Sequence, residues 1–170
     1  MGVGGIIRFD SSAPISVRGL ETSDRRQWEE LWADYNAFYG RTGDAALVPE
    51  IVETTWARLL DESEPVHGFL GVSDGVPVGL AHVVFHPNLI QREPTCYMQD
   101  LFTVPEARGA GVAGALIEAV CGLCRSRGAV DVYWHTHESN HAARRLYDRV
   151  ARNTDFLVYR IKPLPGGDTA

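Results

Sequence analysis

Three glycines close together give the chain a segment that could bind a phosphate group. Gly109, Gly111 and Gly114 follow an apolar run that starts at Tyr97, and an apolar, helix-forming stretch comes after them. Glycine lets a backbone approach phosphate oxygens closely, and the N–H groups of the first helical turn have no acceptor inside the helix. Arg108 adds a positive charge at the same place. The segment therefore indicates a pyrophosphate site at the start of a helix, although an ordinary strand-to-helix turn would show some of the same residues.

A second segment, N-H-A-A-R-R-L-Y from Asn140 to Tyr147, follows another strand-like run at residues 129–136. Asn140 and Tyr147 are separated by about two helical turns, so both side chains would lie on one face of a helix. That face could look toward a ligand bound at the glycine-rich turn.

Together the two segments resemble the GNAT superfamily of acetyl-CoA-dependent N-acetyltransferases, over roughly residues 95–160. The first motif of the family, R/Q-x-x-G-x-G/A, is met here by Arg108, Gly111 and Ala113. The second, N-x-x-A-x-x-L/F-Y, is met by Asn140, Ala143, Leu146 and Tyr147.

The resemblance implies which residues would bind acetyl-CoA. In the family the pantetheine arm pairs with the strand before the turn, like an added strand, and the turn binds the pyrophosphate. The matching positions of this chain are Leu101, Phe102, Thr103, Val104, Arg108, Gly109, Ala110, Gly111, Val112, Ala113, Gly114, Asn140 and Ala143. Tyr147 resembles the tyrosine that protonates the departing thiolate and is the expected catalytic acid, with a buried structural tyrosine as the alternative.

The group that takes the proton from the acceptor amine stays open. An alkylamine is almost wholly protonated at neutral pH, so the site must remove a proton or select the rare neutral form. The segment Y-M-Q-D-L-F most resembles the diamine acetyltransferases, which carry a glutamate where this chain has Gln99. Because a glutamine cannot act as a base, Asp100, Glu138, His135 or His137 would have to substitute through a water molecule.

Two further stretches, residues 28–39 and 133–140, resemble the branch that includes histone and polyamine acetyltransferases. This resemblance implies a cationic acceptor, such as a polyamine or a lysine side chain, and the net charge of −6 suits such a substrate. The expected substrate-binding residues are Asp34, Tyr35, Tyr39, Gln99 and Asp100, whose acidic and aromatic groups would attract and cover an alkylammonium. The alternatives are the amine of an antibiotic or an amino acid, and a non-catalytic acyl-CoA-binding sensor.

Other kinds of site are disfavoured by composition and spacing. The G-x-G-x-x-G of residues 109–114 differs from a dinucleotide-binding fingerprint, because residues 105–108 separate it from the strand and Asp131 lies at the start of the next one. The acidic balance argues against nucleic acid as a partner. Cys121 and Cys124 have no second ligand pair, so we expect core residues in a reducing compartment and no metal site.

The pattern of elements predicts one domain over residues 1–170, with flexible ends at 1–13 and 165–170. We expect strands at residues 15–18, 66–72, 76–85, 129–136 and 156–161 besides the strand before the turn, and helices at 22–39, capped by Thr22 or Ser23, and at 49–60. This order matches the α/β fold of the family, a mixed, twisted, mostly antiparallel sheet flanked by helices and splayed where acetyl-CoA enters. Neither a signal peptide nor a membrane span is predicted, so we expect a cytoplasmic protein. The apolar last strand would make an unsuitable open edge, which favours a homodimer.

Overall fold

The computed structural model describes residues 13–161 of the chain. The chain divides into two compact units, Met1–His135 and Thr136–Ala170. The flexible ends expected from the sequence fall outside the described residues except for Ala13, and the single domain over 1–170 stays a prediction. Among the residues described, no helix is both long and apolar enough to cross a membrane.

The first unit contains a mixed sheet whose described strands follow one another in chain order. β1 (Ile15–Gly19), β2 (Val66–Ser73), β3 (Val76–His86) and β4 (Thr95–Thr103) are antiparallel neighbours, and β5 (Val132–Tyr133) pairs parallel to β4. The expected fold class, an α/β protein with a mixed and mostly antiparallel open sheet, is confirmed.

An Asp-Gly pair between two apolar runs predicts a hairpin, and the turn between β2 and β3 forms as this sequence predicts. Asp74 and Gly75 both have positive φ, 49° and 76°, and Ser73 pairs directly with Val76. A two-residue turn with both central residues in the left-handed region matches the twist of the strands that it joins, so the predicted hairpin is confirmed.

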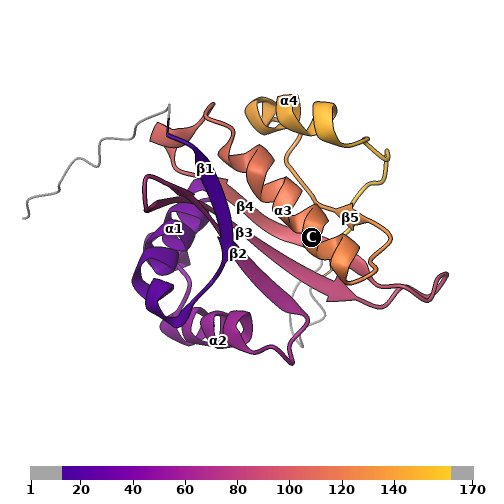
Figure 1. Ribbon diagram of the computed structural model, residues 1–170, viewed down its shortest axis with the longest axis horizontal. Coiled ribbons are helices and arrows are strands. Elements are labelled where there is room, and N and C mark those ends of the chain that lie inside the picture. The colour runs from indigo at the N-terminus through magenta and orange to yellow at the C-terminus, as the bar shows by residue number, and fades with distance from the viewer. Residues whose placement is uncertain (1–12, 162–170) are drawn as a thin grey trace, which may run out of the picture. The chain divides into compact units, whose positions relative to one another are not determined.

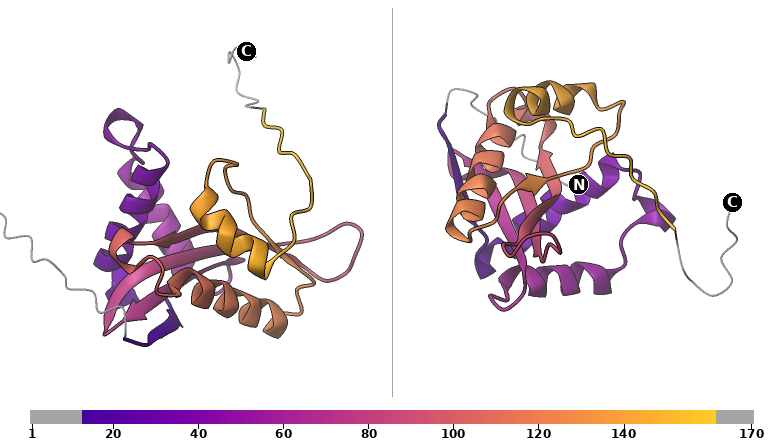
Figure 2. Two further views of the ribbon diagram at one scale, coloured as in Figure 1. Left: turned by 90° about the horizontal axis from the view of Figure 1, so that it is seen from above. Right: turned by 90° about the vertical axis from the view of Figure 1, so that its right-hand side faces the viewer.

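Helices cover both faces of the sheet (Figure 1). α1 (Arg25–Phe38) and α2 (Pro49–Leu60) lie on one face, and α3 (Val112–Ser126) lies on the other, as Figure 2 shows from two further sides. α3 packs closely, because a Cβ atom added to Gly71 or Gly79 would lie within 3 Å of a methyl group of Val112. The α1 face carries the main aromatic core, which includes Trp28, Leu31, Trp32, Tyr35, Leu70, Leu80 and Phe102.

The first helix starts later than the sequence suggested. Residues Thr22–Asp24 form a 3₁₀ turn, so the cap expected at Thr22 or Ser23 is wrong. Asp24 accepts a hydrogen bond from the Glu21 N–H at 2.8 Å and two from the Arg18 guanidinium at 2.6 and 2.7 Å. The buried Asp24 carboxylate therefore links the start of α1 to β1. The hydrogen bonds from Arg18 hold the pKa of Asp24 below the usual value.

Two predicted strands do not form over their expected lengths. The run at residues 129–136 contains only Val132–Tyr133 as strand. Residues 156–161 form no strand and are exposed, with Phe156 and Tyr159 about nine-tenths accessible. A run of apolar and aromatic residues favours a strand, but a strand also needs a neighbouring edge, and none of the described residues pairs with residues 156–161. The homodimer that rested on this strand stays a prediction.

The second unit contains α4 (His141–Val150), which includes the second motif. Asn140 is the N-cap of α4, and its side-chain oxygen accepts a hydrogen bond from the Ala143 N–H at 3.4 Å. Its side-chain nitrogen donates to Thr136 Oγ1 at 3.3 Å. The motif therefore begins as a helix cap, the position that asparagine favours.

Candidate active site

A β-bulge lies at Gln99 in the middle of β4. Asp100 pairs with His82 of β3, whereas Val83, the next residue of β3, pairs with Met98, so Gln99 is the extra residue. Side chains alternate between the faces of a regular strand, and Met98 and Asp100 would then share one face. The extra residue reverses this alternation and turns Asp100 to the opposite face.

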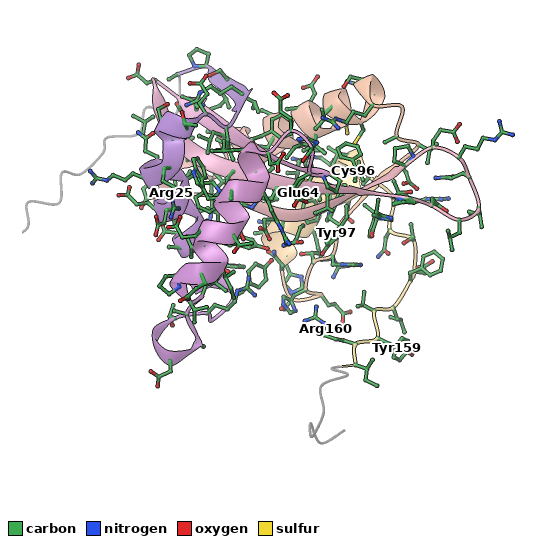
Figure 3. The ribbon with its side chains drawn as sticks, turned by 90° about the horizontal axis from the view of Figure 1, so that it is seen from below. Arg25, Glu64, Cys96, Tyr97, Tyr159 and Arg160 are labelled. Carbon is green, nitrogen blue, oxygen red and sulfur yellow. The ribbon has the colours of Figure 1, made fainter. Side chains whose placement is uncertain are left out.

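Contacts with the helices establish which face is which. Before the bulge, Cys96 hydrogen-bonds to Cys124 of α3 and so lies on the α3 face. Tyr97 is its neighbour on β4, and Figure 3 labels both side chains, which point to opposite faces. After the bulge, Asp100 accepts a hydrogen bond from Trp32 of α1 and so lies on the α1 face. Bulges of this kind commonly re-aim side chains next to active sites.

Asp100 belongs to a buried hydrogen-bond network between α1 and the sheet. The indole N–H of Trp28 donates to His82 Nε2 at 2.8 Å, and His82 Nδ1 lies 2.8 Å from Asp100 Oδ2. The indole N–H of Trp32 donates to the same carboxylate oxygen at 3.1 Å, and the Tyr35 hydroxyl also hydrogen-bonds to Asp100. Because an indole N–H can only donate, Nε2 of His82 must accept, and the ring proton lies on Nδ1 and points at Asp100.

This network makes Asp100 a poor general base. Burial acts to raise the pKa of Asp100, but the hydrogen bonds from His82, Tyr35 and Trp32 hold it below the usual value. A carboxylate with a depressed pKa that is 5% exposed and already accepts several hydrogen bonds has little capacity to take a proton from an amine. Asp100 instead connects α1 to the bulge of β4.

A cluster of phenol and imidazole groups lies where β4 and β5 meet. The rings of Tyr97 and Tyr133 stack with centroids 5.1 Å apart, and His135 Nδ1 lies 3.3 Å from the Tyr97 hydroxyl. His86 Nε2 lies 3.2 Å from the Tyr133 hydroxyl. Of the four groups considered as bases, His135 is the one in the first unit that is exposed and has imidazole chemistry.

The C-terminal end of α1 brings most of the expected acceptor-side residues together. The Tyr35 hydroxyl lies 3.4 Å from the Gln99 carbonyl oxygen, and the rings of Tyr35 and Tyr39 meet edge to face with centroids 5.1 Å apart. Burial, followed by the charge of Asp100, raises the pKa of both phenols, so both stay protonated at neutral pH. Asp34 does not join them, because it is exposed and has no hydrogen bond or ion pair with any described residue.

The glycine-rich turn has the backbone that an anion site needs. Gly109 and Gly111 have φ of 83° and 89°, which glycine adopts readily, and Gly111 is the N-cap of α3. A Cβ atom added to Gly109, Gly111 or Gly114 would have no neighbour within 4 Å, so the space over the first turn of α3 is open to a ligand. Arg108 is held beside the turn, since its Nε donates to the Thr103 carbonyl at 3.3 Å. These residues fit a pyrophosphate group.

The strand that leads to this turn has an open edge. β5 pairs with β4 only at Cys96 and Tyr97 among the described residues, although β4 continues to Thr103. Among the residues described, the edge of β4 from Met98 onward has no strand partner, which fits the expected splay of the sheet.

Sequence reasoning missed the network around Asp100 and the role of the bulge. His82 stands alone within the apolar run of β3, and a single histidine among buried residues is a signal of a partnered side chain. Trp28 and Trp32 are four residues apart on one helix face, which predicts a core position but does not show that both indole groups donate hydrogen bonds. Arg41, whose guanidinium lies beside the rings of Tyr35 and Tyr39, carried no recognisable sequence signal.

The chain is also similar in sequence to known proteins. The sequence model of the Acetyltransferase (GNAT) family matches residues 25–151. The chain is 34% identical over 148 residues to the D-amino-acid N-acetyltransferase HPA3 of Saccharomyces cerevisiae, covering 86% of this chain and 89% of that protein. It is 29% identical over 89 residues to a thialysine N-epsilon-acetyltransferase of Caenorhabditis elegans, covering 52% of this chain and 55% of that protein.

The fold is also similar to a solved structure. The structure of AAC(6')-Iy in complex with the bisubstrate analog CoA-S-monomethyl-acetylneamine superimposes with a TM-score of 0.75. The match covers 89% of this chain and all of that chain at 17% sequence identity. At this identity the likeness concerns the fold alone.

Proposed function

Because the chain belongs to the acetyltransferase (GNAT) family and is an acetyl-CoA-dependent N-acetyltransferase, we propose that its acceptor is the primary amine of an amino acid. The position of Arg41 carries this proposal. Its guanidinium carbon lies 5.9 Å from the ring centroid of Tyr35 and 5.5 Å from that of Tyr39, the two rings expected to cover an alkylammonium. A second cation beside this guanidinium would be repelled, whereas an acceptor that also carries a carboxylate would be attracted.

The names of the relatives support the same class of acceptor. The yeast protein is named for D-amino acids, and the nematode protein is named for the ε-amine of thialysine, itself an amino acid. These names differ in which amine is acetylated, so the proposal covers both the α-amine and a side-chain amine of a free amino acid.

A cationic amine without a carboxylate, such as a polyamine or a lysine side chain in a protein, is the second candidate. The net charge of −6 favours it, since an acidic protein attracts cations. Arg41 acts against it locally, because a short-range repulsion at the acceptor side outweighs a screened long-range attraction.

A thiol-release assay with acetyl-CoA and a panel of amines tests the proposal. The panel contains free D- and L-amino acids, diamines and polyamines, lysine peptides and an aminoglycoside. We expect the highest kcat/KM with a free amino acid. Faster turnover of diamines or lysine peptides would replace the proposal with the second candidate.

Most of the residues proposed to bind acetyl-CoA lie in two places in the first unit. The open edge of β4, with residues 101–104, would pair with the pantetheine arm, and the turn at 109–114 with Arg108 would bind the pyrophosphate through backbone N–H groups. Acetyl-CoA supplies the acetyl thioester when bound. Asn140 and Ala143 are proposed as further contacts from their place in the second motif.

Replacing Gly114 with leucine should weaken coenzyme A binding by at least about tenfold. Gly114 lies in the first turn of α3 without positive φ, and an added side chain would project into space that is open in the protein. The leucine would therefore block an approaching phosphate without straining the backbone, unlike Gly111→Val, where φ is 89°. Isothermal titration calorimetry with coenzyme A measures the loss.

Gly122→Leu is the matched control, because Gly122 lies on the same helix about two turns further on. A Cβ atom there would meet only Arg125 Nη2 at 3.9 Å, an ordinary contact. The control should bind coenzyme A as the parent protein does. Equal affinity for Gly114→Leu and the parent would show that the pyrophosphate binds elsewhere.

The proton transfers are assigned to two residues. We propose Tyr147 as the acid that protonates the thiolate, on the strength of its place in the second motif. His135 is the proposed base, through a water molecule, because Gln99 cannot take a proton and Asp100 is buried with a depressed pKa.

A further inference from the structure

The end of α1 fixes Arg41 in a rigid position. Gly40 has φ of 75°, its N–H donates to the Ala37 carbonyl at 2.9 Å, and the Arg41 N–H donates to the Asn36 carbonyl at 3.0 Å. This pair of hydrogen bonds is a Schellman motif, which ends the helix and sets the direction in which the following residue leaves. The backbone of Arg41 is thus fixed by the helix itself.

The side chain of Arg41 is fixed as well. Its Nε donates to Asn36 Oδ1 at 2.6 Å, and the Asn36 side-chain nitrogen donates to the Trp32 carbonyl at 2.7 Å. Since that carbonyl can only accept, the amide oxygen of the buried Asn36 must face Arg41. The rings of Tyr35 and Tyr39 support the guanidinium, so three separate contacts restrain it.

The two terminal nitrogens of Arg41 are not used by these contacts. Neither has a hydrogen bond or ion pair with any residue that the structure describes, and the residue is exposed. A guanidinium held at Nε leaves a planar edge whose two N–H groups match the two oxygens of a carboxylate. The guanidinium lies over the ring of Tyr35, and the Tyr35 hydroxyl contacts the Gln99 carbonyl, so Tyr35 connects Arg41 to the bulge of β4.

We propose that Arg41 binds the carboxylate of the acceptor through its two terminal nitrogens and so selects amino acids over amines that lack this group. The proposal rests on the amino-acid acceptor proposed above. Arg41 is a specificity residue here, because it contacts the substrate away from the reacting nitrogen. Because Asn36 and two rings already restrain the Arg41 side chain, carboxylate binding costs less conformational entropy.

The test compares each amino acid with its carboxamide, which keeps the amine and the side chain but removes the negative charge. The probes are D-phenylalanine with D-phenylalaninamide and L-lysine with L-lysinamide. In the parent protein we expect the acid of the preferred pair to have the lower KM. In Arg41→Gln, KM for the acid should rise by about tenfold or more, the usual effect of losing a charge-assisted hydrogen bond, while KM for the amide changes little. Arg41→Lys should keep part of the preference, because it keeps the charge but loses the planar fork.

Arg26→Gln is the matched control, because Arg26 is an exposed arginine at the other end of α1 that pairs with Glu30. It should leave both KM values unchanged. If Arg41→Gln raises KM equally for acid and amide, Arg41 only supports the tyrosine rings and this proposal is wrong, and the amino-acid acceptor then rests on the names of the relatives and on the amine panel alone. If the parent protein acetylates the amides but not the acids, the proposed function fails together with this inference.

Discussion

Replacing Tyr147 with phenylalanine should lower kcat by about 10²-fold or more and leave the affinity for coenzyme A nearly unchanged. Only the hydroxyl is removed, and a general acid acts mainly in the transition state, where the thiolate leaves. The ring remains, so packing on α4 (His141–Val150) is kept. Steady-state kinetics with the best acceptor of the panel give kcat, and calorimetry gives the coenzyme A affinity.

Tyr159→Phe is the control for this change. Tyr159 is about nine-tenths exposed, so loss of its hydroxyl should change neither kcat nor binding. If Tyr147→Phe kept the kcat of the parent protein, another acid or a water molecule would protonate the thiolate. If it lowered coenzyme A affinity as strongly as kcat, the hydroxyl would be a binding group in the ground state.

Local sequence patterns predicted the parts of the fold that depend on local physics. The hairpin formed because Asp74 and Gly75 accept positive φ, and α1 and α2 formed because apolar residues repeat at helical spacing. The glycine-rich turn likewise could be read from residue types, since Gly109 and Gly111 are needed where φ is positive. In each case the residues that decide the conformation are neighbours in the chain.

The features that could not be predicted depend on residues far apart in the sequence. The bulge at Gln99 is defined only by the pairing of β4 with β3. The amino-acid sequence by itself gives no sign that Asp100 changes to the other face of the sheet. The apolar run at 156–161 predicted a strand, but the sequence does not say whether an edge is available to it. The position of the Arg41 guanidinium beside the rings of Tyr35 and Tyr39 is set by the helix end at Gly40 and by the Asn36 side chain. No sequence motif indicates this arrangement.

Replacing Asp100 with leucine should destabilise the protein by about 3 kcal/mol or more. The change leaves the N–H groups of Trp32 and His82 buried without their acceptor, and each unsatisfied donor costs about 1–3 kcal/mol. Asp100→Asn should cost less, because its amide oxygen can still accept from both donors. Urea unfolding at pH 7 measures the free energy of unfolding for both variants. Asp34→Leu, an exposed change on α1 with the same loss of charge, should lie within about 0.5 kcal/mol of the parent protein.

The difference in unfolding free energy between the parent protein and Asp100→Asn should depend on pH. This dependence separates the effect of the Asp100 charge from the effect of its shape. The pKa of Asp100 in the folded protein lies below its unfolded value, so the charged form contributes stability above the unfolded pKa, about 3.9, and loses it as the pH falls through the folded pKa. The gap between the parent protein and Asp100→Asn should therefore be largest near neutral pH and shrink below about pH 4. If the difference in unfolding free energy stayed constant down to pH 3, the charge of the carboxylate would contribute nothing to stability. If Asp100→Leu proved as stable as Asp34→Leu, the network would not hold α1 against the bulge, and the acceptor side of the site would have to be held by the aromatic core alone.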